Sequence, residues 1–118
     1  MNSIVTRFAP SPTGYLHLGG IRTALLNYIV VQQAKRNLPN SKFYLRIEDT
    51  DKERSKDEYK AQIIKSLKWI GIDYNGNEYI QSSKIDSHIK IAKELLKNGY
   101  AYKCYCSSEE IEEQKKRA

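Results

Sequence analysis

At residues 7–20 the chain reads Arg7-Phe8-Ala9-Pro10-Ser11-Pro12-Thr13-Gly14-Tyr15-Leu16-His17-Leu18-Gly19-Gly20. The residues that lead into this run, 4–8, are mostly β-branched or aromatic and predict a short buried strand. The two prolines stiffen the loop that follows, because each biases the residue before it towards extended backbone, and Gly14 adds one permissive position. Gly19 and Gly20 allow a ligand to approach the backbone where the next helix begins, and a helix N-terminus suits phosphate. The run therefore predicts a nucleotide site between a strand and a helix.

The sequence after this run predicts a second strand parallel to the first. Residues 21 to about 35 are expected to form a helix that ends at 37–40, with a broad apolar face of Leu25, Leu26, Ile29 and Val30. Residues 42–47 carry Phe43, Leu45 and Ile47 at period two, which is typical of a strand. A strand, a helix and a strand in this order make a right-handed parallel crossover. The glycine-rich loop would then lie at the carboxyl end of the first strand, where open α/β sheets bind ligands.

Further elements follow from the apolar spacing of the rest of the chain. A helix over about 56–70 is predicted by Tyr59, Ile63, Leu67 and Ile70, with Gly71 as its stop. Trp69 is interpreted as a packing residue of that helix. The remaining expectations are a turn at 73–77, an extended piece at 78–80, a helix over 85–97 that ends at 98–99, an extended stretch at 101–106 and a charged helix from Ser107 or Ser108. The helix over 85–97 has an apolar stripe of Ile85, Ile89, Ala92, Leu95 and Leu96, and its His88 is interpreted as a surface residue.

Length and composition limit the function classes. With 118 residues, of which 40% are hydrophobic, the chain can form one small domain. Its 20 basic and 14 acidic residues give a net charge of +6, which favours an anionic partner such as RNA or ATP, although solubility alone would also explain it. No apolar run approaches the roughly 20 residues of a membrane span, and no secretory signal is visible. A cytoplasmic protein without a membrane segment is expected.

The run at residues 7–20 resembles the class I aminoacyl-tRNA synthetases, and within them the glutamate–tRNA ligase family. His17-Leu18-Gly19-Gly20 is similar to the His-Ile-Gly-His signature of that class. The resemblance implies that His17, Gly19, Gly20 and Thr13 contact ATP, and that His17 helps to stabilise the transition state of adenylation. Glycine replaces the second histidine of the signature, so a mechanism that uses two histidines of this motif is not possible here. A histidine near two glycines is also commonly a capping or surface residue, and the full fourteen-residue run is what makes the match specific.

A second match, Arg46-Ile47-Glu48-Asp49-Thr50-Asp51, ends the second predicted strand. Its position at a strand's carboxyl end points Glu48 towards the same crevice as the glycine-rich loop. The resemblance implies that Glu48 contacts the α-amino group of glutamate, that Arg7 pairs with a carboxylate of glutamate, and that Ala9 and Ser11 line the same pocket. A guanidinium fork suits a carboxylate. For Asp49 and Asp51 the alternative is that they are capping residues.

A third match is the pair Cys104 and Cys106. The two cysteines are too close for an easy mutual disulfide and suggest reduced thiols or zinc ligands. In many members of the resembled family such a pair binds zinc together with ligands about twenty residues downstream, whereas a structural zinc site needs four ligands. The pair therefore supplies half of a possible zinc site, and the alternative is two ordinary, partly buried cysteines.

The resemblance as a whole implies an α/β fold, namely the N-terminal half of the Rossmann-type nucleotide-binding domain of a class I synthetase, a parallel sheet with flanking helices. Residues 1–100 would belong to that catalytic domain and residues 101–118 to the start of an inserted acceptor-stem and zinc-binding region. The implied reaction activates glutamate with ATP and Mg²⁺ and transfers it to the 3′ end of tRNA(Glu), in an enzyme that is a monomer.

The lysine-rich loop that closes class I sites does not occur, so the chain is expected to be a marginally stable, inactive fragment of a longer enzyme. Two alternatives stay open. One is a paralogue that glutamylates a modified tRNA base, and the other is a non-catalytic remnant that binds nucleotide or RNA.

Overall fold

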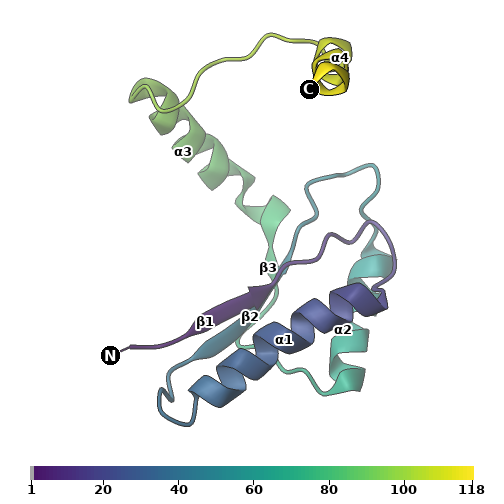
Figure 1. Cartoon of the computed structure of the whole chain (residues 1–118), viewed down its shortest axis with the longest axis vertical. Helices are drawn as coiled ribbons and strands as arrows, with labels where there is room; N and C mark the ends of the chain where they lie inside the picture. The colour runs from purple at the N-terminus through teal and green to yellow at the C-terminus, as the bar shows by residue number, and fades with distance from the viewer. Residues whose placement is uncertain (1) are drawn as a thin grey trace. The chain divides into compact units, whose positions relative to one another are not determined.

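The computed structural model describes residues 2–118, and the described residues divide into two compact units, the first ending at Lys84 and the second running from Ile85 to Ala118. The first unit contains β1 (Val5–Phe8), α1 (Leu18–Ala34), β2 (Lys42–Ile47), α2 (Asp57–Ile70), β3 (Tyr79–Ile80) and a 3₁₀ helix, η1 (Gln81–Lys84) (Figure 1). The second unit contains α3 (Ile85–Lys97) and α4 (Ser108–Arg117). No helix among the described residues has the length and apolar character that crossing a membrane requires.

The three strands form one parallel sheet in the order β1-β2-β3, so β2 is the central strand. In the register, Thr6 lies beside Phe43, Phe8 beside Leu45, and Ile47 beside Ile80. Both connections within the sheet therefore run through a helix, as parallel neighbours require. The predicted parallel crossover and the α/β fold class are confirmed.

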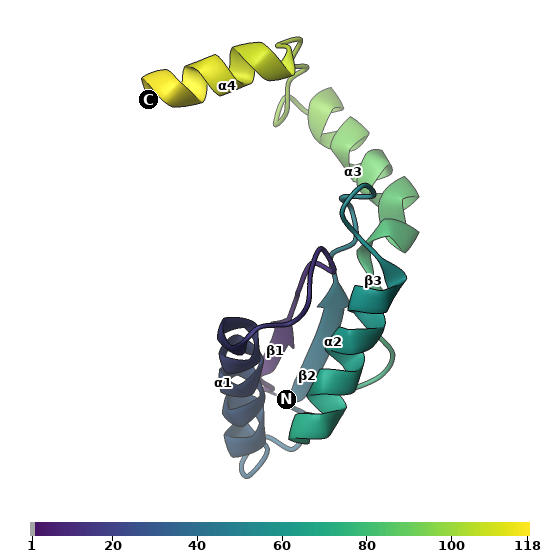
Figure 2. The same cartoon turned by 90° about the vertical axis from the view of Figure 1, so that its right-hand side faces the viewer.

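The core of the first unit lies between one face of the sheet and the two long helices. Side chains alternate along a strand, and the buried ones of β1 and β2 all share one face. They pack together with residues of α1 and α2, which run beside the sheet (Figure 2). The core consists of Phe8, Ala24, Val31, Phe43, Leu45, Ile47, Ile63, Leu67 and Ile72.

The N-terminal end and the buried side of α1 differ from the prediction. The helix begins at Leu18, three residues earlier than expected, and includes Gly19 and Gly20 in its first turn. Its buried residues are Ala24 and Val31, whereas the predicted apolar face of Leu25, Leu26, Ile29 and Val30 is exposed. The apolar residues of α1 surround much of the helix, so their spacing did not define which side meets the sheet.

The prediction for α2 is right in its core positions and wrong for Trp69. Ile63 and Leu67 are buried, and Gly71 ends the helix in the left-handed region with φ 84°. Trp69 is 87% exposed. Because each helical residue turns the direction by 100°, a residue two positions after Leu67 points away from the side that packs on the sheet.

The second unit confirms the predicted helix limits. α3 spans the expected residues 85–97, and His88 is exposed as expected. None of the residues of α3 is buried, including those of its apolar stripe. Ser107 caps α4, accepting from the Glu110 N–H at 3.2 Å while Glu110 Oε2 accepts from the Ser107 N–H at 2.7 Å. This reciprocal pair is a capping box.

Candidate active site

The loop between β1 and α1 is fixed to the rest of the first unit at three points. The Glu48 N–H donates to the Pro10 carbonyl at 2.9 Å, which continues the parallel pairing of β1 and β2 beyond the strands. The Lys56 N–H donates to the Pro12 carbonyl at 3.1 Å, and Gln62 Oε1 accepts from the Leu16 N–H at 2.9 Å. The loop is therefore held by the end of β2 and by α2, and its residues line three pockets.

The first pocket, which we call the Arg7–Glu48 pocket, has a volume of about 490 Å³. It brings together Arg7, Ala9 and Glu48, three of the four residues expected to bind glutamate. Ser11, the fourth, lines a different pocket. The other lining residues come from β1 and α1 and are Val5, Thr6, Phe8, Thr23 and Asn27. The pocket thus contains a guanidinium and a carboxylate, the complements of the two charges of an amino acid.

The carboxylate of Glu48 is paired with Arg46, a residue that the sequence analysis gave no role. Glu48 Oε1 accepts from Arg46 Nη2 at 2.6 Å and from Arg46 Nε at 3.1 Å. Period-two alternation along β2 puts these two side chains on the same face, and this signal was available in the sequence. Arg7 forms no ion pair with any residue in 2–118, so its guanidinium is open to a ligand.

The second pocket, which we call the His17 pocket, has a volume of about 300 Å³. It contains His17, Thr13 and Gly20, three of the four residues expected to contact ATP, and also Ser11. The remaining lining residues are Phe8, Pro10, Gly14, Tyr15, Leu16 and Ile63. The first turn of α1 begins at this pocket, so its free N–H groups lie where phosphate would be favoured.

His17 occupies the N-cap position of α1 without acting as a side-chain cap. Its backbone is extended, and its imidazole accepts no hydrogen bond from the first turn. The ring is exposed, which leaves both nitrogens free for a ligand. Gly19 does not line the pocket, but a Cβ there would lie 3.1 Å from His17 Nδ1 and Cε1. The absence of a side chain at Gly19 therefore leaves room for the imidazole in its observed position.

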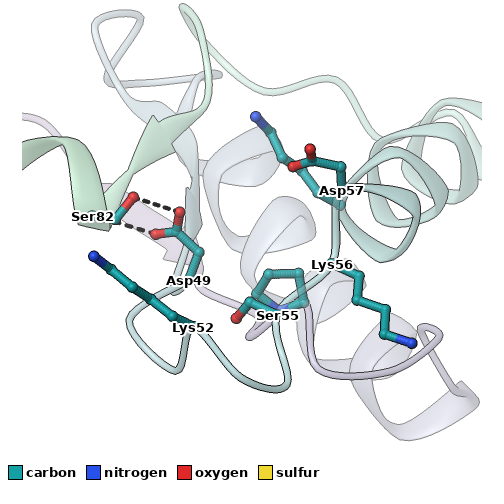
Figure 3. Close-up of a pocket in the computed structure, with 8 residues that line it drawn as sticks. Asp49, Lys52, Ser55, Lys56, Asp57 and Ser82 are labelled. Atoms are coloured by element: carbon teal, nitrogen blue, oxygen red, sulfur yellow. Dashed lines mark hydrogen bonds between the residues drawn. The ribbon is translucent and has the colours of Figure 1, made fainter.

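A third pocket of about 210 Å³ lies beside the residues that follow β2 (Figure 3). Asp49 points to Ser82, with Oδ1 accepting from the Ser82 N–H at 2.8 Å and Oδ2 accepting from Ser82 Oγ at 2.6 Å. Burial raises the pKa of Asp49, but the two bonds from Ser82 outweigh this and lower the pKa overall. The lining residues are Pro12, Asp49, Lys52, Ser55, Lys56, Asp57, Lys60 and Ser82.

The capping interpretation is wrong for the helix that follows these aspartates, because neither of them caps α2. Asp49 binds the backbone at η1, and Asp51 Oδ1 accepts from the Arg54 N–H at 3.1 Å. Hydrogen bonds from the side chain and backbone of Arg54 lower the pKa of Asp51. Lys56 is the N-cap of α2 and forms no side-chain cap.

The two cysteines are exposed and interact with each other. Hydrogen bonds from the backbone and side chain of Cys106 lower the pKa of Cys104, and the same interaction raises the pKa of Cys106. No group of three or more potential metal ligands occurs among residues 2–118. Two thiols fill only half of a tetrahedral zinc site, so these residues by themselves do not fit a structural zinc ion.

A parallel sheet whose first loop and following helix border a pocket with an unpaired histidine places the molecule in the class of open α/β proteins. More narrowly, the chain belongs to the family of class I tRNA synthetases (E and Q), catalytic domain, whose family model matches residues 3–118. The resemblance stated from the sequence is confirmed.

Relatives over the whole chain are glutamate–tRNA ligases. The chain is 69% identical over 118 residues to the one from Pelagibacter ubique and 52% identical over 118 residues to glutamate–tRNA ligase 1 of Orientia tsutsugamushi, in each case with 100% of this chain and 24% of the relative covered. It therefore spans about a quarter of the length of these relatives.

Solved structures agree with this family. A glutamate–tRNA ligase from Elizabethkingia meningosepticum, determined in complex with its amino acid, matches with a TM-score of 0.80 and 35% identity, over 97% of this chain and 23% of that one. The glutamate–tRNA synthetase from Elizabethkingia anophelis matches with a TM-score of 0.82 and 34% identity, over 98% of this chain and 24% of that one.

Proposed function

We propose that this chain is the N-terminal part of the active site of a glutamate–tRNA ligase. The observation that carries the proposal is the Arg7–Glu48 pocket, where two sequence-distant motifs contribute opposite charges beside the loop that bears His17. The 69% identity with a glutamate–tRNA ligase over the whole chain supports the same activity.

In the proposed reaction the two pockets hold the two substrates. Arg7 binds a carboxylate of glutamate and Glu48 binds its ammonium group, with Ala9 and Ser11 nearby, while His17, Thr13, Gly19 and Gly20 face ATP and its Mg²⁺. The glutamate carboxylate attacks the α-phosphate of ATP, which gives glutamyl-adenylate and releases pyrophosphate. The 3′-terminal adenosine of tRNA(Glu) then accepts the glutamyl group. Positioning and charge stabilisation are the means of catalysis that such a site offers.

The proposal extends to the surroundings of the site. Residues 1–100 would belong to the catalytic domain and residues 101–118 to the beginning of the acceptor-stem region of a monomeric, cytoplasmic enzyme. Residue 1 of the first range lies outside the described residues. Zinc binding at Cys104 and Cys106 would require two more ligands from a longer polypeptide.

The two alternative functions are less well supported. The relatives reported above are ligases and not tRNA-base-modifying paralogues, and the motif from Arg46 to Asp51 is the one expected for the ligase. A non-catalytic remnant would have no use for separate groups that bind an ammonium and a carboxylate.

The test uses this chain grafted in place of the matching quarter of the Pelagibacter ubique ligase, with ATP–pyrophosphate exchange dependent on glutamate and tRNA(Glu) as the assay. His17→Ala is expected to lower kcat by about 100-fold or more, as loss of a transition-state donor does. Glu48→Gln is expected to raise KM for glutamate and leave KM for ATP unchanged. Arg36→Gln, on the exposed turn after α1, is the control. Normal kinetics for both site variants would refute the site, and the isolated chain is expected to show no exchange.

A further inference from the structure

Hydrogen bonds hold both the backbone and the side-chain carboxylate of Glu48. Its N–H donates to the carbonyl of Pro10, which ties its backbone to the loop after β1. Its carboxylate accepts two hydrogen bonds from Arg46, both at Oε1, at 2.6 and 3.1 Å. No residue in 2–118 forms a hydrogen bond with Oε2. One carboxylate oxygen is therefore anchored, and the other is available to a ligand.

Arg46 binds this carboxylate but does not line the Arg7–Glu48 pocket. Glu48 lines the Arg7–Glu48 pocket, whereas Arg46 does not. The two side chains are 31% and 33% exposed, so the pair is partly shielded from solvent. Arg46 lies in β2, where the register places it beside Tyr79 of β3.

Arg7 is the other cation on this face of the sheet that lines a pocket with Glu48. The register places Arg7 beside Tyr44, so side-chain alternation puts Arg7, Arg46 and Glu48 on the same face of the sheet. Arg7 and Glu48 line one pocket and have opposite charges, yet the structure contains no ion pair between them. If they paired, each would neutralise the other, and the pocket would lose both groups with which it could bind an amino acid.

We propose that Arg46 is a positioning residue that holds the Glu48 carboxylate away from Arg7, so that the pocket presents a separated cation and anion to the amino acid. The two donors of Arg46 bind the oxygen that the ligand does not use and leave Oε2 facing the ammonium group. This inference rests on the proposed function of Arg7 and Glu48 in glutamate binding.

A double-mutant cycle in the grafted ligase tests the inference. Arg46→Gln is expected to raise KM for glutamate roughly fivefold, the size appropriate to a partly exposed charge pair. KM for ATP and kcat should change by less than about twofold, since the His17 pocket is untouched. In the Glu48→Gln background, Arg46→Gln should have no further effect, because Arg46 acts only through Glu48. Arg46→Lys keeps the charge but not the fork, so its KM should lie between those of the wild type and Arg46→Gln.

The outcomes separate the two proposals. If Glu48→Gln leaves KM for glutamate unchanged, the proposed glutamate site is wrong, and the inference about Arg46 is wrong with it. If Glu48→Gln raises KM but Arg46→Gln does not, only the inference about Arg46 is overturned. An additive effect in the double variant, or a parallel loss of affinity for ATP, would also overturn it, because either result indicates an independent or general structural role. Arg36→Gln removes the same charge elsewhere and should behave as the wild type.

Discussion

Replacing Gly19 with alanine should separate the stability of the fold from the function of His17. An alanine Cβ at this position would lie 3.1 Å from His17 Nδ1 and Cε1, closer than the roughly 3.5 Å of an ordinary contact. The ring must therefore move by a few tenths of an ångström. A misplacement of about 1 Å in a reacting group can lower the rate about 100-fold. The smaller shift of the imidazole in Gly19→Ala therefore predicts a loss of about tenfold in kcat.

The effect of the same substitution on stability should be small, because two contributions oppose each other. Alanine in a helix is favoured over glycine by about 0.5–1 kcal/mol, and displacing a side chain from its rotamer costs about 0.5–1.5 kcal/mol. The free energy of unfolding should therefore change by less than about 1 kcal/mol.

Exchange kinetics of the grafted ligase and thermal unfolding of the chain followed by circular dichroism measure the two quantities. Gln32→Ala, at an exposed position of the same helix, is the control that raises helix propensity without approaching His17. An unchanged kcat in Gly19→Ala would show that the position of the imidazole is not critical. A destabilisation above about 2 kcal/mol would show that the backbone, and not the ring, bears the strain.

Three further outcomes concern the fold and are measured by urea unfolding of the chain. Leu67→Ala, in the core, should lower the free energy of unfolding by about 2–5 kcal/mol, whereas Trp69→Ala should change it by less than about 0.5 kcal/mol because that side chain is 87% exposed. Gly71→Ala places a Cβ at φ 84° and should lower the free energy of unfolding by about 1 kcal/mol. Gly71→Asn is the control, and a stability close to that of the glycine protein would exclude a general packing effect. Asp49→Asn should cost about 1 kcal/mol at pH 7 through its weakened bonds to Ser82. The folded-state pKa of Asp49 is lowered, so the stabilisation by this carboxylate is present above the ordinary carboxyl pKa and disappears as the pH falls through the folded value. The free energies of unfolding of the wild type and Asp49→Asn should therefore converge below about pH 4. A difference that stays constant with pH would contradict this assignment.

Local sequence predicted the elements whose signals are local. The limits of β2 and α3 were predicted to the residue, because period-two alternation and a glycine stop are properties of adjacent positions. The start of α1 was placed three residues late, since Gly19 and Gly20 were interpreted only as points of close approach and not as part of the first helical turn. Glycine is tolerated there because the first N–H groups of a helix have no intrahelical partner in any case.

Features that depend on contacts between residues far apart in the chain could not be predicted from the local sequence. The exposed side of α1 contains larger apolar residues than its buried side, where Ala24 lies close to the sheet, so apolar spacing alone pointed to the wrong side. η1 was not predicted, because the Ser82 N–H in this helix donates to the carboxylate of Asp49, 33 residues away in the sequence. In the site, every residue predicted from the first two motifs except Gly19 lines one of these two pockets, but the motifs did not predict that Ser11 and Ala9 line different ones.

The central position of β2 also determines how the molecule opens to solvent. β2 pairs with β1 over Lys42–Leu45 and with β3 over Arg46–Ile47, whereas the outer edge of β1 has no neighbouring strand among the described residues. Hydrogen exchange should therefore be slowest at β2 and faster along the free edge of β1. Because the Glu48 N–H is bonded to Pro10, the loop that borders both pockets should open together with the end of β2, so the binding residues would stay ordered for as long as that end of the strand does.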